Sequence, residues 1–116
     1  MNRLTAWSTQ HKALSEPLRI RLLSLVAAAG EMCVCDLITI TGVSQSMVSR
    51  HLAYLRNSGW LVARRDKLWM HYRLADPEDQ MAKAILEAIR QHGPQSQQIQ
   101  NDLSALAQLT EPGSSC

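Results

Sequence analysis

The stretch TGVSQSMVSRHLAYLRNSG, residues 41–59, decides the fold predicted for this chain. Gly42–Val43 is typical of a tight turn, and Ser44 is placed to cap a helix that ends at Ser58–Gly59. A shorter helical pattern, Val34–Thr41, precedes the turn. The two helices and the turn together predict a helix-turn-helix. Apolar residues of the longer helix recur at the spacing of one buried stripe: Val48, Leu52 and Leu55.

Two runs rich in aliphatic and aromatic residues follow this unit, WLVARR at 60–65 and LWMHYRL at 68–74. Polar residues are interleaved in both runs, and Asp66–Lys67 lies between them, so the pattern predicts a β-hairpin. The tip of the hairpin is basic, with Arg64, Arg65 and Lys67. A helix-turn-helix followed by a basic hairpin is typical of a winged helix. The predicted fold class is therefore mainly α with a β-hairpin wing.

The segments on either side are predicted to be helical. Arg3–Leu14 forms a first helix, and Ser15 caps a second helix that ends at Gly30. After the wing, Asp76 caps a further helix, which Gly93–Pro94 stops. The second helix has one buried stripe: Leu18, Leu22, Leu25 and Ala29.

The helix after Asp76 also carries an apolar stripe, which we expect to join two copies of the chain. The chain has 116 residues, no phenylalanine and 4% aromatic residues, so smaller side chains must build its core. A small helical domain of this composition often completes its core by dimerising. We therefore expect a homodimer. The stripe consists of Met81, Ala84, Ile85, Ala88 and Ile89.

The net charge of +2 is unevenly distributed along the chain. Between Ser44 and Arg73 six basic residues stand against one acidic residue, which gives this segment a charge of +5. A basic middle on a near-neutral chain indicates a surface that faces a polyanion, although a solvated charged face has the same composition. An odd number of cysteines, without a secretory signal, favours a reducing cytoplasm.

Two of the three cysteines, Cys33 and Cys35, lie one residue apart at the start of a predicted helix. Thiolates bind soft ions, and a helix N-terminus increases the thiolate fraction. The alternative, that the two are merely small buried residues, is weak, because two of the three cysteines of the chain fall within one tripeptide. Side chains at i and i+2 share a face in a strand but not in a helix. Both sulfurs therefore reach one ion only if the turn at Val34–Asp36 is extended or distorted, which would strain the helix-turn-helix.

The segment EMCVCDLITITGVSQSMVSRHLAYLRNSGWLVARRDKLWMHYRL, residues 31–74, resembles the ArsR/SmtB family of bacterial winged-helix repressors, and most of all its arsenic-responsive branch. The similarity extends from about Ser15 to Ile89. It implies a homodimer that binds a palindromic operator in double-stranded DNA and dissociates when a metal or metalloid binds. We accordingly assign residues 1–93 to a winged helix-turn-helix domain for DNA binding and dimerisation. Residues 94–116 are expected to form a C-terminal tail with a weak helix and a flexible end.

The resemblance also implies roles for single residues. The base-reading residues would be Gln45, Ser46, Ser49 and Arg50, and those that bind phosphate or the minor groove would be Arg64, Arg65 and Lys67. For Ser46 the alternative is a plain first-turn residue, and for His51 we expect a packing role. Trivalent arsenic, or antimony, would bind Cys33 and Cys35, with no permanent cofactor. Similar arsenic repressors have a third cysteine where this chain has Ile38, so the third ligand is Cys116, a thiol from elsewhere, or no sulfur.

Two other functions remain open on the sequence. The first is a repressor switched by oxidation of Cys33 and Cys35 to a disulfide or a sulfenic acid. The second is a repressor of the same fold that senses cadmium, lead or zinc. The cadmium and lead branch adds cysteines in an N-terminal extension, which residues 1–32 lack, and the zinc branch uses Asp and His ligands on the dimerisation helix, where His92 stands alone. An enzyme is not expected, because the cysteines have neither a βαβ pattern nor a catalytic His–Asp grouping around them.

Overall fold

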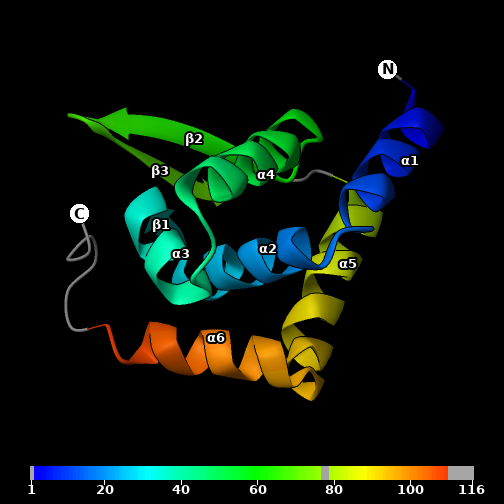
Figure 1. Ribbon diagram of the computed structural model, residues 1–116. Coiled ribbons are helices and arrows are strands. Elements are labelled where there is room, and N and C mark those ends of the chain that lie inside the picture. Colours follow the sequence, from blue (N-terminus) through cyan, green and yellow to red (C-terminus); the bar gives the residue numbers. More distant parts are fainter. Residues whose placement is uncertain (1, 77–78, 110–116) are drawn as a thin grey trace.

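The computed structural model describes residues 2–76 and 79–109 of the chain (Figure 1). Its helices are α1 Arg3–Ala13, α2 Pro17–Ala29, α3 Val34–Thr41, α4 Gln45–Asn57, α5 Gln80–His92 and α6 Gln97–Ala107, with a short 3-10 helix at Gly93–Gln95. Its strands are β1 Glu31–Cys33, β2 Leu61–Asp66 and β3 Trp69–Leu74. This architecture confirms the predicted fold class. Among the described residues, no helix combines the length and the apolar character that crossing a membrane requires.

The helix-turn-helix consists of α3 and α4, with the turn where the sequence predicts it. Gly42 has a φ of 68° and a ψ of 15°, a left-handed conformation that glycine adopts without a steric penalty. Ser44 Oγ accepts a hydrogen bond of 3.3 Å from the backbone N–H of Met47, as expected of an N-cap. The predicted stripe of α4 is fully buried: Val48, Leu52 and Leu55. The opposite face of α4 is therefore left for solvent or a partner.

The wing belongs to a three-stranded antiparallel sheet in the order β1-β3-β2. The hairpin of β2 and β3 is the predicted one, whereas the sequence pattern does not predict β1. This short strand pairs with β3 so that Glu31 lies opposite Arg73 and Cys33 lies opposite His71. One face of the sheet is buried through Met32, Leu61 and Tyr72. The first cysteine is thus joined to the wing by main-chain pairing.

The predicted cap of α2 is wrong. Its N-cap is Glu16, whose carboxylate accepts a hydrogen bond of 3.2 Å from the backbone N–H of Leu18. Ser15 instead donates its hydroxyl to the carbonyl of Lys12, 2.7 Å away, because it still belongs to the end of α1. The stripe of α2 is buried at Leu18, Leu22 and Leu25, but Ala29, the last helical residue, is exposed.

The predicted cap of α5 is also wrong. The helix begins at Gln80, and Asp79 is its N-cap, accepting a hydrogen bond of 2.9 Å from the backbone N–H of Met81. Asp76 lies ahead of this cap, and residues 77–78 lie outside the described part of the chain. Asp79 also accepts a hydrogen bond from Nε1 of Trp7, so the cap joins α1 to α5.

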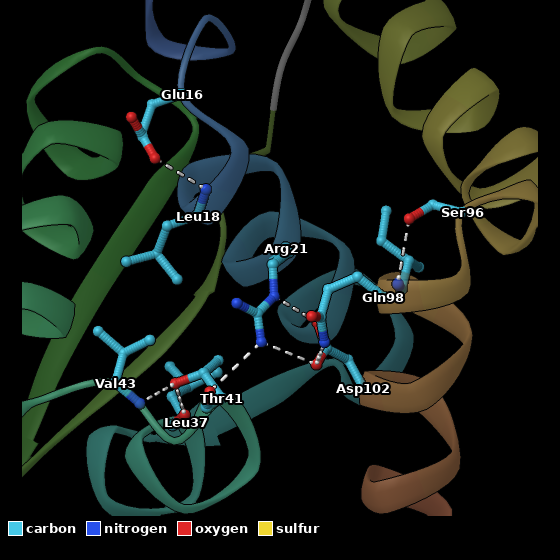
Figure 2. A network of polar contacts seen from close by, with 10 residues as sticks. Glu16, Leu18, Arg21, Leu37, Thr41, Val43, Ser96, Gln98 and Asp102 are labelled. Carbon is cyan, nitrogen blue, oxygen red and sulfur yellow. Dashed lines mark hydrogen bonds and ion pairs between the residues drawn. The ribbon is translucent and has the colours of Figure 1, made fainter.

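The helix expected beyond residue 94 is α6, which runs along α2 on the side away from α4 (Figure 1). It also contacts α3. Ile99 and Asp102 of α6 are buried, and Arg21 of α2 points toward Asp102 in the polar network of Figure 2. Residues 97–107 therefore pack onto the helix-turn-helix rather than lying apart from it.

Candidate nucleic-acid interface and thiol site

The N-terminal half of α4 presents polar side chains on the face opposite its buried stripe. Gln45, Ser46 and Arg50 are exposed, and Ser49 is partly exposed. The Nη2 atom of Arg50 lies 2.8 Å from Sδ of Met47, one turn earlier. Helix-turn-helix proteins contact base edges in the major groove with the N-terminal residues of their second helix. The four residues predicted to read bases thus share one accessible helix face.

Arg19 of α2 contacts α4 from its buried side, a role that the sequence pattern does not predict. The residue is 9% exposed, and its Nε donates a hydrogen bond of 2.7 Å to the carbonyl of Ala13. Its guanidinium lies 4.0 Å from the ring centroid of Tyr54, and its Nη1 lies 3.2 Å from Nδ1 of His51. Arginine only donates, so this contact requires a neutral His51 with its proton on Nε2. Burial first, and then the charges of Arg19 and Arg50, lower the pKa of His51.

The wing residues predicted to bind DNA differ in their surroundings. Arg65 and Lys67 are exposed close to the tip. Arg64 forms an ion pair with Glu31 of β1, with 2.6 Å between Nη2 and Oε1 and 3.0 Å between Nε and Oε2. The hydrogen bond from Arg64 lowers the pKa of Glu31, and the same bond raises the pKa of Arg64. The charge of Arg64 is thus partly compensated within the chain, whereas Arg65 and Lys67 extend into solvent.

Cys33 and Cys35 lie at the junction between the sheet and the helix-turn-helix. Cys33 is the last residue of β1 and also the N-cap of α3, with a φ of −72° and a ψ of 144°. Cys35 is the second residue of α3, and the exposed fractions of the two are 4% and 8%. Val34–Asp36 is helical, so one member of the pair is extended and the other helical. Within 2–76 and 79–109, no three His, Cys, Asp or Glu residues are placed to hold a metal ion, and Cys116 lies outside these ranges.

A pocket of about 170 Å³ opens beside the second of these cysteines. Its walls come from α3, from the first residue of α4 and from the wing. The lining residues are Val34, Cys35, Ile38, Thr39, Gln45 and Trp69. A predicted thiol ligand and a predicted base-reading residue therefore share one pocket. Trp69 is not among the site residues predicted from the sequence, although the alternation in LWMHYRL places it on the same strand face as His71.

The apolar stripe of α5 is accessible in the described chain. Met81 is 38% exposed, Ala84 and Ala88 are exposed, and Ile85 and Ile89 are half-buried. A groove of about 360 Å³ continues from this stripe toward α2 and α6. The residues through which α5 packs on its own chain are Ala82 and Leu86, which lie beside the predicted stripe and were missed.

Comparison with known sequences gives consistent matches. The sequence model of the family described as "Bacterial regulatory protein, arsR family" matches residues 16–61. The arsenical resistance operon repressor of Escherichia coli is 42% identical over 76 residues, 66% of this chain and 65% of the relative. The arsenic resistance transcriptional regulator ArsR2 of Pseudomonas putida is 48% identical over 67 residues, 58% of this chain and 57% of the relative. The match thus spans less than two thirds of the length of these two relatives.

A third relative is matched over more of its length. The arsenical resistance operon repressor of Bacillus subtilis is 32% identical over 75 residues, 65% of this chain and 71% of the relative. Among solved structures, HlyU from Vibrio cholerae has a TM-score of 0.67 and 26% identity, covering 78% of this chain and 96% of its own. A homodimeric winged helix-turn-helix DNA-binding domain from Mycobacterium bovis has a TM-score of 0.64 and 28% identity, covering 81% of this chain and 87% of its own.

Proposed function

Because this chain belongs to the arsR family of bacterial regulatory proteins, we propose that it is a DNA-binding transcriptional repressor that releases its operator when trivalent arsenic binds. The observation that carries the proposal is the position of Cys33. This thiol ends the strand that pairs with the wing and caps the first helix of the helix-turn-helix. A ligand bound there acts on both parts of the protein that face DNA. The genes released from repression would be those for arsenic resistance.

The DNA-binding part of the proposal is supported by the polar face of α4 and the exposed cations of the wing. Gln45, Ser46, Ser49 and Arg50 enter the major groove, and Arg65 and Lys67 contact phosphate or the minor groove. Arg64 joins these two only if it leaves or shares its contact with Glu31. The operator is palindromic, with half-sites about one helical turn apart, because a two-fold symmetric dimer presents two copies of α4.

The dimer is supported by the accessible apolar stripe of α5. An amphipathic helix that leaves isoleucine side chains half-buried on its own chain gains free energy by covering them with a second copy. We propose that Met81, Ala84, Ile85, Ala88 and Ile89 form the centre of this interface. The helix α1 lies next to α5 through the contact of Trp7 with Asp79 and extends the interface.

The inducer part of the proposal follows from the chemistry and conformation of the two cysteines. Thiolate sulfur is the preferred ligand of a soft centre such as trivalent arsenic or antimony. Each bond to arsenic replaces one hydroxyl of arsenous acid and releases one water. Since Cys33 is extended and Cys35 is helical, bringing both sulfurs to one arsenic atom changes the first turn of α3. The operator-binding arrangement is then disfavoured, which is a coupling free energy between two sites.

The decisive test is a titration of the reduced protein on a labelled duplex selected from a random pool by the protein itself. Arsenite should release the wild-type protein, as followed by fluorescence anisotropy. Cys33→Ser and Cys35→Ser should bind the duplex with unchanged affinity and fail to respond. Cys116→Ser distinguishes a third thiol from a site with two, because only in the first case does it require more arsenite. If Cys33→Ser and Cys35→Ser both leave the duplex at the arsenite concentration that releases the wild-type protein, the assignment of these two cysteines as the arsenic site is wrong.

The same titration separates the other two functions. Release by peroxide without any metalloid would indicate an oxidative switch of the cysteines. Release by cadmium, lead or zinc, with no response to arsenite or antimonite, would indicate a different soft-metal sensor. If the proposal is correct, arsenite should release the DNA in the presence of a phosphine reductant, without peroxide and without another metal ion.

A further inference from the structure

The tip of the wing carries a leucine that the fold itself does not use. The strands β2 and β3 pair as far as Asp66 and Trp69, so the loop between them consists of Lys67 and Leu68. Leu68 is 83% exposed, more than any other large hydrophobic side chain of the part of the chain that the structure describes. A single exposed leucine needs no explanation by itself, so the argument depends on what surrounds it.

The backbone of this loop is one that its residues do not favour. Lys67 has a φ of 59°, and among residues 2–76 and 79–109 it is the only residue other than glycine with a positive φ. Two-residue hairpin loops usually have asparagine, aspartate or glycine in such a conformation, because the Cβ of other residues is disfavoured there. A loop selected for folding alone would thus hold small polar residues. A cation and a large aliphatic side chain stand there instead, and conformational outliers of this kind cluster at functional sites.

The loop lies beside the end of α4 that is proposed to enter the major groove. Trp69, the residue after Leu68, lines one pocket together with Gln45, the first residue of α4. In Figure 1 the closed end of the hairpin projects past the helices. A duplex that receives the start of α4 in its major groove therefore meets the loop with its adjacent backbone and minor groove.

The charges around Leu68 fit a polyanion better than a protein surface. Arg65 and Lys67 are exposed next to it, and Asp66 is the one acidic residue of 60–74. If a second copy of the chain covered the leucine, these cations would lose water in an apolar interface, which is costly. The minor groove offers negative potential to the cations and the faces of base pairs to the leucine.

On the premise that the protein binds its operator through α4, we propose that Leu68 enters the minor groove beside each half-site and partly separates two base pairs. Architectural DNA-binding proteins use leucine and other apolar side chains as wedges in this way, and the wedge kinks the duplex. Arg65 and Lys67 bind the phosphates next to the opened step. Since TA and CA steps unstack most easily, the wing selects such a step without a hydrogen bond to a base edge. The protein therefore bends its operator as well as reading it.

The first test measures base stacking in the operator complex of the reduced, full-length protein. The fluorescent base aminopurine, which brightens when it is unstacked, replaces the adenines in the flanks of the selected duplex in turn. The wild-type protein should brighten one position in each flank, Leu68→Ala should abolish this rise, and Leu68→Met should retain it. No rise at any flanking position in the wild-type complex would overturn the inference and leave the proposed function standing. If the wild-type protein binds no duplex, the proposed function itself fails.

The second test measures the bend and the preference for a flexible step. Energy transfer between dyes at the two ends of the duplex should report a bend that Leu68→Ala reduces. With a TA step in each flank, Leu68→Ala should bind about tenfold more weakly than the wild-type protein, and with stiff A-tract flanks the two should bind equally. Because Leu68 is exposed, Leu68→Ala should leave the urea unfolding midpoint unchanged.

Lys67→Gln is the matched control on the same loop. It removes a cation but keeps the wedge, so the slope of log affinity against log salt should become shallower by about one unit while the aminopurine signal and the preference for TA remain. Two results would overturn the inference. One is an equal loss of affinity by Leu68→Ala on both duplexes, and the other is a loss of self-association in sedimentation with an unchanged DNA bend, which would assign Leu68 to a protein contact.

Discussion

Asp102 of α6 binds Arg21 of α2 through both of its carboxylate oxygens, with 2.9 Å between Nε and Oδ2 and 3.0 Å between Nη2 and Oδ1 (Figure 2). The same Nη2 lies 3.4 Å from the carbonyl oxygen of Thr41, the last residue of α3. Gln98 donates a further hydrogen bond of 3.2 Å to Asp102. A buried carboxylate of the C-terminal helix is thereby connected to the point where the helix-turn-helix makes its turn.

Asp102→Asn should destabilise the protein strongly. The variant keeps the size of the side chain but leaves the charge of Arg21 without its partner, in a site where Asp102 is 3% exposed. Breaking a buried pair in this way costs about 3 kcal/mol. Urea unfolding followed by circular dichroism measures the change. Glu87→Gln, in the exposed pair with Arg90, is the control and should change stability by less than about 0.5 kcal/mol.

Arg50→Ala should weaken operator binding by about 1–3 kcal/mol and relax the sequence preference, if Arg50 contacts a base edge. The measurement is anisotropy on the selected duplex and on a scrambled one. Arg56→Ala is the control. It removes the same charge from the other end of α4, which does not face the groove. Equal weakening on both duplexes would show that Arg50 contacts phosphate only.

Ile85→Asp should dissociate the dimer. A charge placed in the centre of an apolar interface without a partner should weaken self-association by about two orders of magnitude or more. Sedimentation velocity across a range of protein concentrations measures the effect. Lys83→Asp, on the solvent face of the same helix, serves as the control. If Ile85→Asp sediments as a full dimer, the interface lies elsewhere.

Glu31→Gln should tighten DNA binding at low salt. The carboxylate that pairs with Arg64 is lost, so the guanidinium becomes available to a phosphate. One added phosphate contact makes the slope of log affinity against log salt steeper by about one unit. Anisotropy at several salt concentrations gives this slope, and Glu87→Gln makes the same change of net charge far from the wing. An unchanged slope would mean that Arg64 does not contact DNA.

Acidification below about pH 6.5 should destabilise the contact between α2 and α4. The folded protein lowers the pKa of His51, so the unfolded chain binds more protons in the interval between the two values. The contribution of His51 to stability is therefore complete above the pKa that it has in the unfolded chain. It is lost as the pH falls through the lower pKa that it has in the folded protein. His51→Gln should show a smaller loss of stability between pH 7 and pH 5 in urea unfolding. If His51→Gln loses as much stability over this pH interval as the wild-type protein does, groups other than His51 cause the loss.

The sequence predicts the features of this protein that are determined locally. Gly42 and Ser44 define the turn and the start of α4 by their own backbone and side-chain preferences, and the alternation around Asp66–Lys67 defines the hairpin. The strand β1 has too few residues to show a period, and it exists only because β3 lies beside it. The pairs Arg64–Glu31 and Arg21–Asp102 likewise join residues far apart in the chain. The pocket at Trp69 requires the register of the sheet, which local patterns do not determine.

Cys33 closes a strand and opens a helix, and no residue lies between the two roles. Where a loop connects a sensing segment to the element that it controls, the dihedral freedom of that loop can absorb part of any displacement. At the junction of β1 and α3 this chain has no connecting loop, because β1 ends at Cys33 and α3 begins at Val34. A displacement of the sulfur of Cys33 that moves its backbone must change the strand edge and the helix start in the same step. The connection between input and output is therefore mechanically stiff, and a small ligand suffices to act on it.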